Sequence, residues 1–337
     1  MSSPVRVEKR GHVMEVTLDR PKVNAIDLAT SRALGAAFVE MQADANIRCG
    51  IVTAAGDRIF CAGWDLKSAH QNEEVGKWWE TTDYGPGGFA GLTELWSLNK
   101  PVIAAVNGLA LGGGFELAIA CDLIICAEHV EFALPELPIG IIPDSGGIQR
   151  VPRRLPHNIA MELLLLGRRM KAEEALHYGM INKIVPKDQP LAAAREWAAT
   201  IAEGAPLTIQ ALKEALREMD GHSIRDSFKL IRSGKLPMYE KSLLSALEEI
   251  SRGGAPMSSK IARMVIDNFH INPNSPLTKR ETEILGLISE GKTYTQISEE
   301  LFISKETSKT HIKNIYSKLQ VNSKSQALAK AAQEKLI

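Results

Sequence analysis

The spacing of apolar residues alternates between two periods in the first third of the chain. Residues 13–20, "VMEVTLDR", are apolar at every second position, which predicts a strand, and residues 28–44 are apolar at helical spacing. Short apolar runs at 49–55 and 101–108 predict buried strands, and residues 112–122 predict a tight glycine turn that enters a helix. This alternation predicts an α/β fold built on several core strands.

The pattern changes twice further along the chain. Residues 158–230 have helical spacing throughout. Residues 243–250 predict a short amphipathic helix that Gly253 and Gly254 end, and residues 258–269 predict another helix before a polar linker. A compact all-helical segment follows. We therefore expect three parts, with boundaries at residues 1–241, 242–276 and 277–337.

Composition is that of an ordinary soluble protein, with 45% hydrophobic and 24% charged residues in a chain of 337. Lysine plus arginine equals aspartate plus glutamate, 40 against 40. The balance is uneven along the chain: residues 277–337 carry ten Lys/Arg and seven Asp/Glu, and residues 304–319 carry four lysines against one glutamate. This local positive charge suits a polyanionic partner such as DNA.

Three further features indicate the compartment. The N-terminus places charges where a signal peptide needs an apolar core, and no apolar run reaches the roughly 18 residues of a membrane span. The four cysteines, Cys49, Cys61, Cys121 and Cys126, lack metal-ligand spacing and lie in apolar or glycine-rich segments. We expect buried free thiols, a cytoplasmic protein that does not enter membranes, and no metal site.

Two glutamates near a glycine turn are the candidate catalytic groups. Gly112 to Gly114 open a helix that contains Glu116, and a helix N-terminus presents N–H groups suited to an oxygen that becomes anionic. If the fold brings Glu116 and Glu136 together, one ionised and one protonated carboxyl can hold a water and pass protons. The alternative is a simple tight turn with two solvated glutamates.

Residues 5 to about 240 resemble the crotonase (enoyl-CoA hydratase/isomerase) superfamily, whose fold is of the ClpP/crotonase type. The similarity rests on "LDRPKVNAID", "FCAGWDLK", "KPVIAAVNGLALGGGFELAIACD", "FALPELPIGIIPDSGG" and "GRRMKAEEALHYGMINKIV". Within the superfamily, "GWDLK", "GPGGFAGLTEL", "GGGFELA" and "IRSGKL" are most similar to the carnitinyl-CoA dehydratase (crotonobetainyl-CoA hydratase) group.

The resemblance implies a site and a reaction. The backbone N–H groups of Trp64 and Gly113 would form the oxyanion hole, and Glu116 and Glu136 match the paired hydratase glutamates, whereas isomerases of the family commonly keep only the later one. The implied substrate is an acyl-CoA thioester, with no cofactor beyond its CoA moiety. The binding residues it implies are Lys22, Ala25 and Ala62 for the thioester and CoA. If the substrate has the carnitine skeleton, our candidates to recognise its quaternary ammonium group are Trp64 and Asp144, because such a cation favours an aromatic face or a carboxylate. The alternative is that Trp64 serves only through its backbone and packing.

The last 61 residues outline a helix-turn-helix. Thr278 and Glu281 form a capping-box pattern, and the lysines at 305, 309 and 313 align on one face of a helix that starts at Ser304. The whole segment resembles the LuxR-type DNA-binding domain. By that resemblance, Lys309, Thr310 and Lys313 face the bases, and Lys305 and Lys318 contact phosphates. Ser308 stands where that family usually has a buried valine.

The join between the parts leaves alternatives open. Residues 242–276 resemble the last helix and linker of a response-regulator receiver domain, and the tail that usually closes a crotonase is missing. The chain is expected to be a hydratase with an appended DNA-binding module. The alternatives are an acyl-CoA-sensing regulator with an inactive crotonase part, or an enoyl-CoA isomerase. A homo-oligomer is expected, as a trimer or a dimer of trimers.

Overall fold

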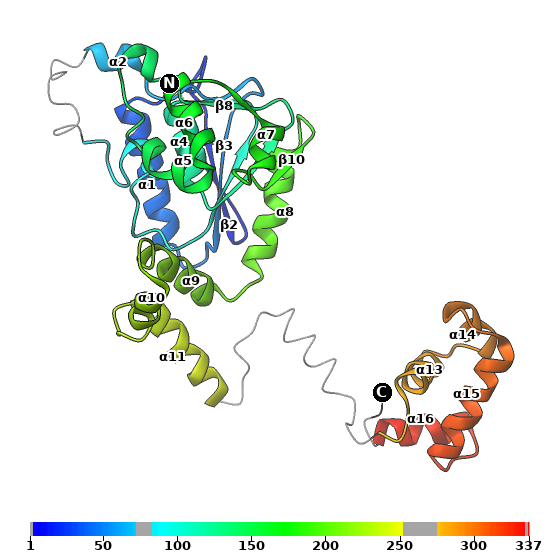
Figure 1. Cartoon of the computed structure of the whole chain (residues 1–337). Coiled ribbons are helices and arrows are strands. Elements are labelled where there is room, and N and C mark those ends of the chain that lie inside the picture. The colour runs from blue at the N-terminus through cyan, green and yellow to red at the C-terminus, as the bar shows by residue number, and fades with distance from the viewer. Residues whose placement is uncertain (1–2, 72–82, 252–274, 334–335, 337) are drawn as a thin grey trace. The chain divides into compact units, whose positions relative to one another are not determined.

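The computed structural model describes residues 3–71, 83–251, 275–333 and 336. The chain divides into two compact units, residues 1–256 and 257–337. The N-terminal unit is α/β, and the elements of the C-terminal unit are all helices within the residues just given (Figure 1). Both features agree with the fold class that the hydrophobic pattern predicts.

The main sheet of the N-terminal unit has six strands in the order β1-β2-β3-β5-β7-β10. Strands β1 and β2 are antiparallel, and the remaining neighbours are parallel. The strands are β1 (Val5–Arg10), β2 (Val13–Leu18), β3 (Cys49–Ala54), β5 (Val102–Val106), β7 (Leu123–Ala127) and β10 (Lys183–Val185). A second sheet joins β4 (Ile59–Cys61), β6 (Leu109–Leu111), β8 (Glu131–Ala133) and β9 (Met170–Lys171).

Helices flank these sheets and extend the unit at its C-terminal end (Figure 1). They are α1 (Leu28–Ala43), α2 (Leu66–Gln71), α4 (Gly113–Ala120), α5 (Gly147–Arg154), α6 (His157–Leu166), α7 (Ala172–His177), α8 (Pro190–Ala202), α9 (Pro206–Glu218), α10 (Ile224–Ile231) and α11 (Pro237–Ser251). Two short 3₁₀ helices, η2 (Phe89–Gly91) and η3 (Leu137–Ile139), lie at the candidate site.

Side chains of the main sheet alternate between two cores, because successive residues of a strand point to opposite faces. On β5, Ile103 and Ala105 face the core that α8 covers, whereas Val102 and Ala104 face the larger core that includes α1 and α4. All four cysteines are buried free thiols, as expected from their sequence context. Burial raises the pKa of each thiol, which suits packing rather than reactivity.

Two expectations about the middle of the chain change. The continuous helical pattern from residue 158 is interrupted, because Gly167 ends α6 with a left-handed φ of 60° and β9 follows. The short helix expected at 243–250 is part of the longer α11, so the expected boundary after residue 241 falls inside a helix that packs on α9. The helix expected at 258–269 lies outside the described residues.

The C-terminal unit consists of α13 (Lys279–Ser289), α14 (Tyr294–Glu300), α15 (Lys305–Lys318) and α16 (Lys324–Gln333). Its small core includes Ile284, Leu285, Ile297, Ile315 and Leu319. The capping box of Thr278 and Glu281 is present, and a second one, Thr293 with Gln296, opens α14. These caps satisfy N–H groups that the first turn of each helix leaves without partners.

Candidate functional site

The candidate catalytic site is a cavity of about 160 Å³ at the start of α4. Among its lining residues are six that the sequence predicts: Ala62, Trp64, Gly113, Glu116, Glu136 and Asp144. Lys22 and Ala25 do not line this cavity. Their loop instead runs beside the 62–64 segment, where Val23 accepts a hydrogen bond from the Ala62 N–H at 3.1 Å and Ile26 donates to the Gly63 carbonyl at 2.8 Å.

Glycines let three backbone segments meet at this cavity. A Cβ on Gly63, whose φ is 86°, would lie 2.7 Å from the Gly113 nitrogen. Gly112 caps α4 with a φ of 53°, and a Cβ there would lie 2.5 Å from Oε1 of Glu136. The Gly112 N–H donates to the Ala133 carbonyl at 2.9 Å, which holds the start of α4 against the end of β8. The glycine triplet is therefore needed for packing as well as for the turn.

Glu116 and Glu136 converge on the cavity from different elements. Glu116 lies in the first turns of α4 and is 3% exposed; its Oε1 accepts the Gly147 N–H at 2.8 Å. Glu136 precedes η3, and its Oε2 is buried with no hydrogen-bond partner among the described residues. A buried carboxylate oxygen without a partner is costly unless it serves a ligand or a proton.

Burial controls the acidity of both carboxyls. Burial, opposed by the Gly147 N–H and reinforced by the charges of Glu136 and Asp144, raises the pKa of Glu116 to about 8. Burial and the charge of Asp144 raise the pKa of Glu136 to about 7. Because two such carboxyls titrate as a pair, the pair retains a proton near neutral pH. The arrangement can therefore both accept and donate a proton.

The structure adds residues that sequence reasoning did not single out. Phe89 lines the cavity and lies against Gly113, where any Cβ would collide with its ring. Tyr84 packs edge-to-face on Phe89 with ring centroids 5.8 Å apart, and the Asp144 charge contributes to raising its pKa to about 12 after the larger effect of burial. The Gly147 N–H holds the Glu116 carboxyl in place by a hydrogen bond. The only sequence signals for these residues are the glycine-rich stretches at 85–91 and 146–147.

The candidate DNA-binding surface is the exposed face of α15. Lys305, Lys309, Thr310 and Lys313 are all exposed. Lys309 forms an ion pair with Glu306 at 2.8 Å and lies 5.2 Å from the Tyr294 ring centroid. The other predicted contact is already engaged within the unit, because the Lys318 ammonium lies 2.7 Å from Oε2 of the buried Glu281.

Two absences hold for the part of the chain that the structure describes. None of its helices combines the length and apolar character needed to cross a bilayer. No three histidine, cysteine, aspartate or glutamate side chains gather there in a way that could hold a metal ion.

Comparison with known proteins identifies the family of each unit. Residues 8–227 match the enoyl-CoA hydratase/isomerase family, and residues 275–331 match the luxR family of bacterial regulatory proteins. The chain is 51% identical over 245 residues to carnitinyl-CoA dehydratase of Proteus mirabilis, covering 73% of this chain and 92% of that protein.

Solved structures give the same assignment. A carnitinyl-CoA dehydratase from Mycobacterium avium aligns with a TM-score of 0.60 and 37% identity, covering 71% of this chain and 93% of that one. An enoyl-CoA hydratase from Mycobacterium tuberculosis aligns with a TM-score of 0.64 and 36% identity, covering 74% and 96%. The chain therefore belongs to the enoyl-CoA hydratase/isomerase family, with a crotonase fold followed by a LuxR-type DNA-binding domain.

Proposed function

We propose that the protein catalyses the reversible hydration and dehydration of a short-chain enoyl-CoA, with crotonobetainyl-CoA and carnitinyl-CoA as the substrate pair. The observation that carries this proposal is the convergence of Glu116 and Glu136 on one cavity beside the Gly113 N–H. The similarity to carnitinyl-CoA dehydratases supports the acyl group. Only the thioester, water and two carboxyls take part, with no cofactor beyond the CoA moiety.

In the proposed mechanism, the backbone N–H groups of Trp64 and Gly113 hold the thioester oxygen. One carboxylate takes a proton from water as the water oxygen bonds to the β-carbon, and the π electrons move through the α-carbon onto the carbonyl oxygen. The other carboxyl then gives its proton to the α-carbon, which restores the carbonyl. The oxyanion donors stabilise the enolate, and losing one such donor typically costs about 10²–10³ in rate. Gly113 is the first residue of α4, so no i−4 carbonyl of that helix is available to its N–H.

Recognition of the quaternary ammonium group is assigned to Trp64 and Asp144, an aromatic face and a carboxylate. Both residues line the cavity. The charge of Asp144 contributes to the raised pKa of Glu116, Glu136 and Tyr84. The Asp144→Asn variant should lose preference for crotonobetainyl-CoA over crotonyl-CoA while retaining turnover of crotonyl-CoA. An unchanged preference would remove Asp144 from this role.

The loop containing Lys22 and Ala25 is proposed to follow the adenine end of CoA through its backbone. The hydrogen bonds between this loop and the 62–64 segment support a path that continues from the oxyanion hole. Lys22 is exposed, so a phosphate of CoA can reach it.

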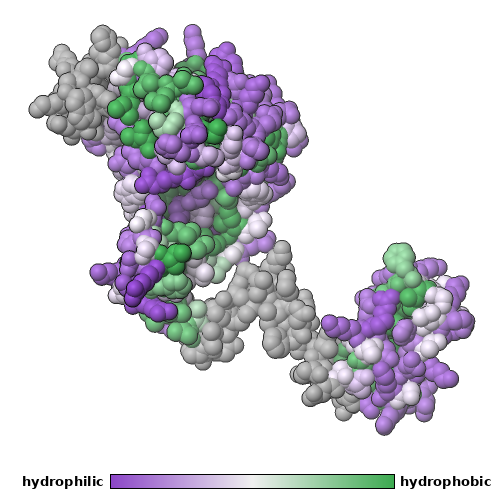
Figure 2. All heavy atoms as spheres, viewed as in Figure 1, coloured by the Kyte–Doolittle hydropathy of each residue, from purple (hydrophilic) through white to green (hydrophobic). Residues whose placement is uncertain are grey.

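The C-terminal unit is proposed to bind DNA through α15, with Lys309, Thr310 and Lys313 toward the bases. Homo-oligomerisation is proposed through the helical end of the N-terminal unit. There, α10 and α11 expose Ile224, Phe228 and the leucines at 243, 244 and 247, and Figure 2 shows hydrophobic side chains gathered over this region. Large exposed apolar side chains in one region favour association.

The first experiment is the loss of enoyl-thioester absorbance with crotonobetainyl-CoA and crotonyl-CoA, using the full-length protein beside Glu136→Gln. Turnover that falls by about 10² or more in the variant supports the two-carboxyl mechanism. No turnover by the folded wild-type protein would favour an acyl-CoA-sensing regulator instead. Formation of a shifted double bond without addition of water would identify an isomerase.

A further inference from the structure

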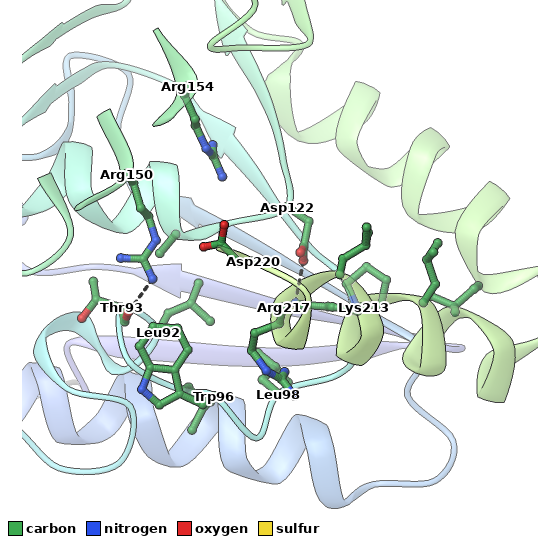
Figure 3. A pocket seen from close by; sticks show the side chains of 16 residues that line it. Leu92, Thr93, Trp96, Leu98, Asp122, Arg150, Arg154, Lys213, Arg217 and Asp220 are labelled. Atoms are coloured by element: carbon green, nitrogen blue, oxygen red, sulfur yellow. Dashed lines mark hydrogen bonds and ion pairs between the residues drawn. The ribbon is translucent and has the colours of Figure 1, made fainter. Parts of the chain in front are cut away.

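A second and larger cavity of about 510 Å³ lies between α9 and the wall formed by α5 and residues 92–101 (Figure 3). None of the residues that line it also lines the catalytic cavity. Lining residues from α5 and α9 include Arg150, Arg154, Lys213 and Arg217, and the carboxylates Asp122 and Asp220 also line it. Four cations against two carboxylates make this a positively charged cavity.

Arg150 and Arg154 are four residues apart, so both lie on the same face of α5. Figure 3 shows both guanidinium groups projecting into the cavity from the same wall. Arg150 donates to the Thr93 carbonyl at 2.6 Å, and Arg154 donates to the Cys121 carbonyl at 3.0 Å. Each guanidinium has five N–H donors, so these bonds leave most of its capacity unused.

The two arginines differ from the other cations of the cavity in their partners. Lys213 pairs with Asp122 at 2.7 Å and Arg217 pairs with Glu218 at 3.1 Å. Within the described residues, no carboxylate lies within 4.0 Å of Arg150 or Arg154. Burial lowers the pKa of both groups, and repulsion from Arg154 lowers that of Arg150 further. Two adjacent, partly desolvated cations are stabilised by an anion placed between them.

Beside these charged groups, the cavity has an apolar wall that is open to a ligand. Trp96 is 61% exposed, and Leu212 and Leu216 on α9 are each 60% exposed. Exposed side chains of this size favour contact with an apolar group. An inorganic anion would pair with the two arginines but would leave the apolar side chains exposed to water. An anion with a hydrocarbon chain would pair with the arginines and also cover these side chains.

We propose that this cavity binds a small organic carboxylate with an apolar chain. The carboxylate would lie between Arg150 and Arg154, whose planar guanidinium groups match its two oxygens. The chain would lie along Trp96, Leu212 and Leu216. This site is separate from the proposed acyl-CoA site, and its ligand is a free acid rather than a thioester.

The test is isothermal titration calorimetry of octanoate into the full-length protein, which does not depend on turnover. We expect saturable binding that Arg154→Gln weakens by about tenfold or more, as loss of a charge-assisted hydrogen bond implies. Arg58→Gln is the control, because Arg58 is an exposed arginine that lines neither cavity. Its affinity for octanoate should equal that of the wild type. Octanol, which has the same chain without the charge, should bind at least about tenfold more weakly than octanoate.

Several outcomes would overturn the proposal. They are no saturable binding by the folded wild-type protein, equal affinity in Arg154→Gln, equal affinity for octanol, or displacement of octanoate by butyryl-CoA, which would place it in the catalytic cavity. If Arg154→Gln dissociates an oligomer that does not bind octanoate, the arginines belong to a subunit interface instead. Arg154→Lys provides a second variant should Arg154→Gln fail to fold: it keeps the charge but loses the planar fork, so weaker octanoate binding is again expected.

Discussion

Gly112 and Glu136 occupy adjoining space so closely that a Cβ on the glycine would lie 2.5 Å from Oε1 of the glutamate. A side chain added at Gly112 would therefore displace the Glu136 carboxyl. The proposed catalytic position of this carboxyl depends on the absence of a side chain on a different element.

Gly112→Ala should therefore displace the Glu136 carboxyl and lower kcat for hydration by about 10² or more. The matched control is Gly140→Ala. Gly140 also has a left-handed φ, 74°, but a Cβ there meets nothing within 4 Å. Gly140→Ala carries the strain of about 1 kcal/mol that alanine has in the left-handed helical region. Gly112 has a ψ of −127° and lies outside that region, so Gly112→Ala is more strained, and the melting temperatures of the two variants measure the difference. Equal activity losses in the two would attribute the effect to strain rather than to Glu136.

The raised pKa of Glu116 predicts a pH-dependent stability of the N-terminal unit. Below its ordinary value of 4.5, the carboxyl is protonated in both folded and unfolded states. Between 4.5 and about 8 only the folded state keeps the proton, so this contribution to stability is lost as pH rises through that window. Above about pH 8, the buried Glu116 carboxyl is ionised, and the free energy of unfolding is lowered by the full amount.

Glu116→Gln removes that penalty and keeps an oxygen for the Gly147 N–H. Its free energy of unfolding should exceed that of the wild type at pH 8 by roughly 2–5 kcal/mol, and by much less at pH 4.5. Glu15→Gln should instead lower the free energy of unfolding at pH 8, and by much less at low pH. The ion pair with Arg195 at 2.7 Å lowers the pKa of Glu15, so its stabilisation is present above 4.5 and lost as pH falls. A pH-independent difference for Glu116→Gln would contradict the assignment.

Ser308 in α15 is fully buried, and its hydroxyl oxygen has no partner among the described residues. Ser308→Val should stabilise the C-terminal unit by about 1–3 kcal/mol, because it removes an unsatisfied polar group and adds apolar volume. Differential scanning calorimetry of the full chain measures this change. Ser317→Val on the exposed face of the same helix is the control and should change stability by less than about 0.5 kcal/mol.

The lysines of α15 should separate into two classes in DNA titrations. Lys305 is exposed and expected to contact a phosphate, so Lys305→Ala should weaken binding and reduce the slope of log affinity against log salt by about 1. Lys318→Ala removes the partner of buried Glu281, so its main effect should be on stability of the unit. Fluorescence anisotropy at several salt concentrations distinguishes the two. A salt slope that changes equally in both variants would place Lys318 on the phosphates.

Much of this architecture is visible in the sequence because it is local. The alternation in 13–20 and the apolar face of 28–44 correspond to β2 and α1 almost residue for residue. The capping box of α13 can be predicted from the four residues 278–281 alone. Resemblance, rather than spacing, is what connects Glu116 to Glu136, since nothing local relates two residues on different elements.

Other features depend on tertiary contacts that no local pattern encodes. The hydrogen bond from the Gly147 N–H to Glu116 and the contact of the Phe89 ring with Gly113 form only when the fold brings distant segments together. Arg150 and Arg154 are an ordinary basic pair in the sequence, and only the fold shows that they line one cavity. The packing of α11 on α9 is another such contact, and the helix begins at Pro237, before the amphipathic segment that the sequence indicates.

The backbone contacts among Gly63, Gly112 and Gly113 also define which mutations the site can accept. In a saturation library of the N-terminal unit, these positions should reject every side chain whatever substrate is used for selection. The side chains of Trp64 and Asp144 also line the cavity and are proposed to recognise the acyl group, so their tolerated substitutions should differ from one acyl group to another. Laboratory evolution toward new thioesters therefore has a small set of side chains to vary around an invariant backbone.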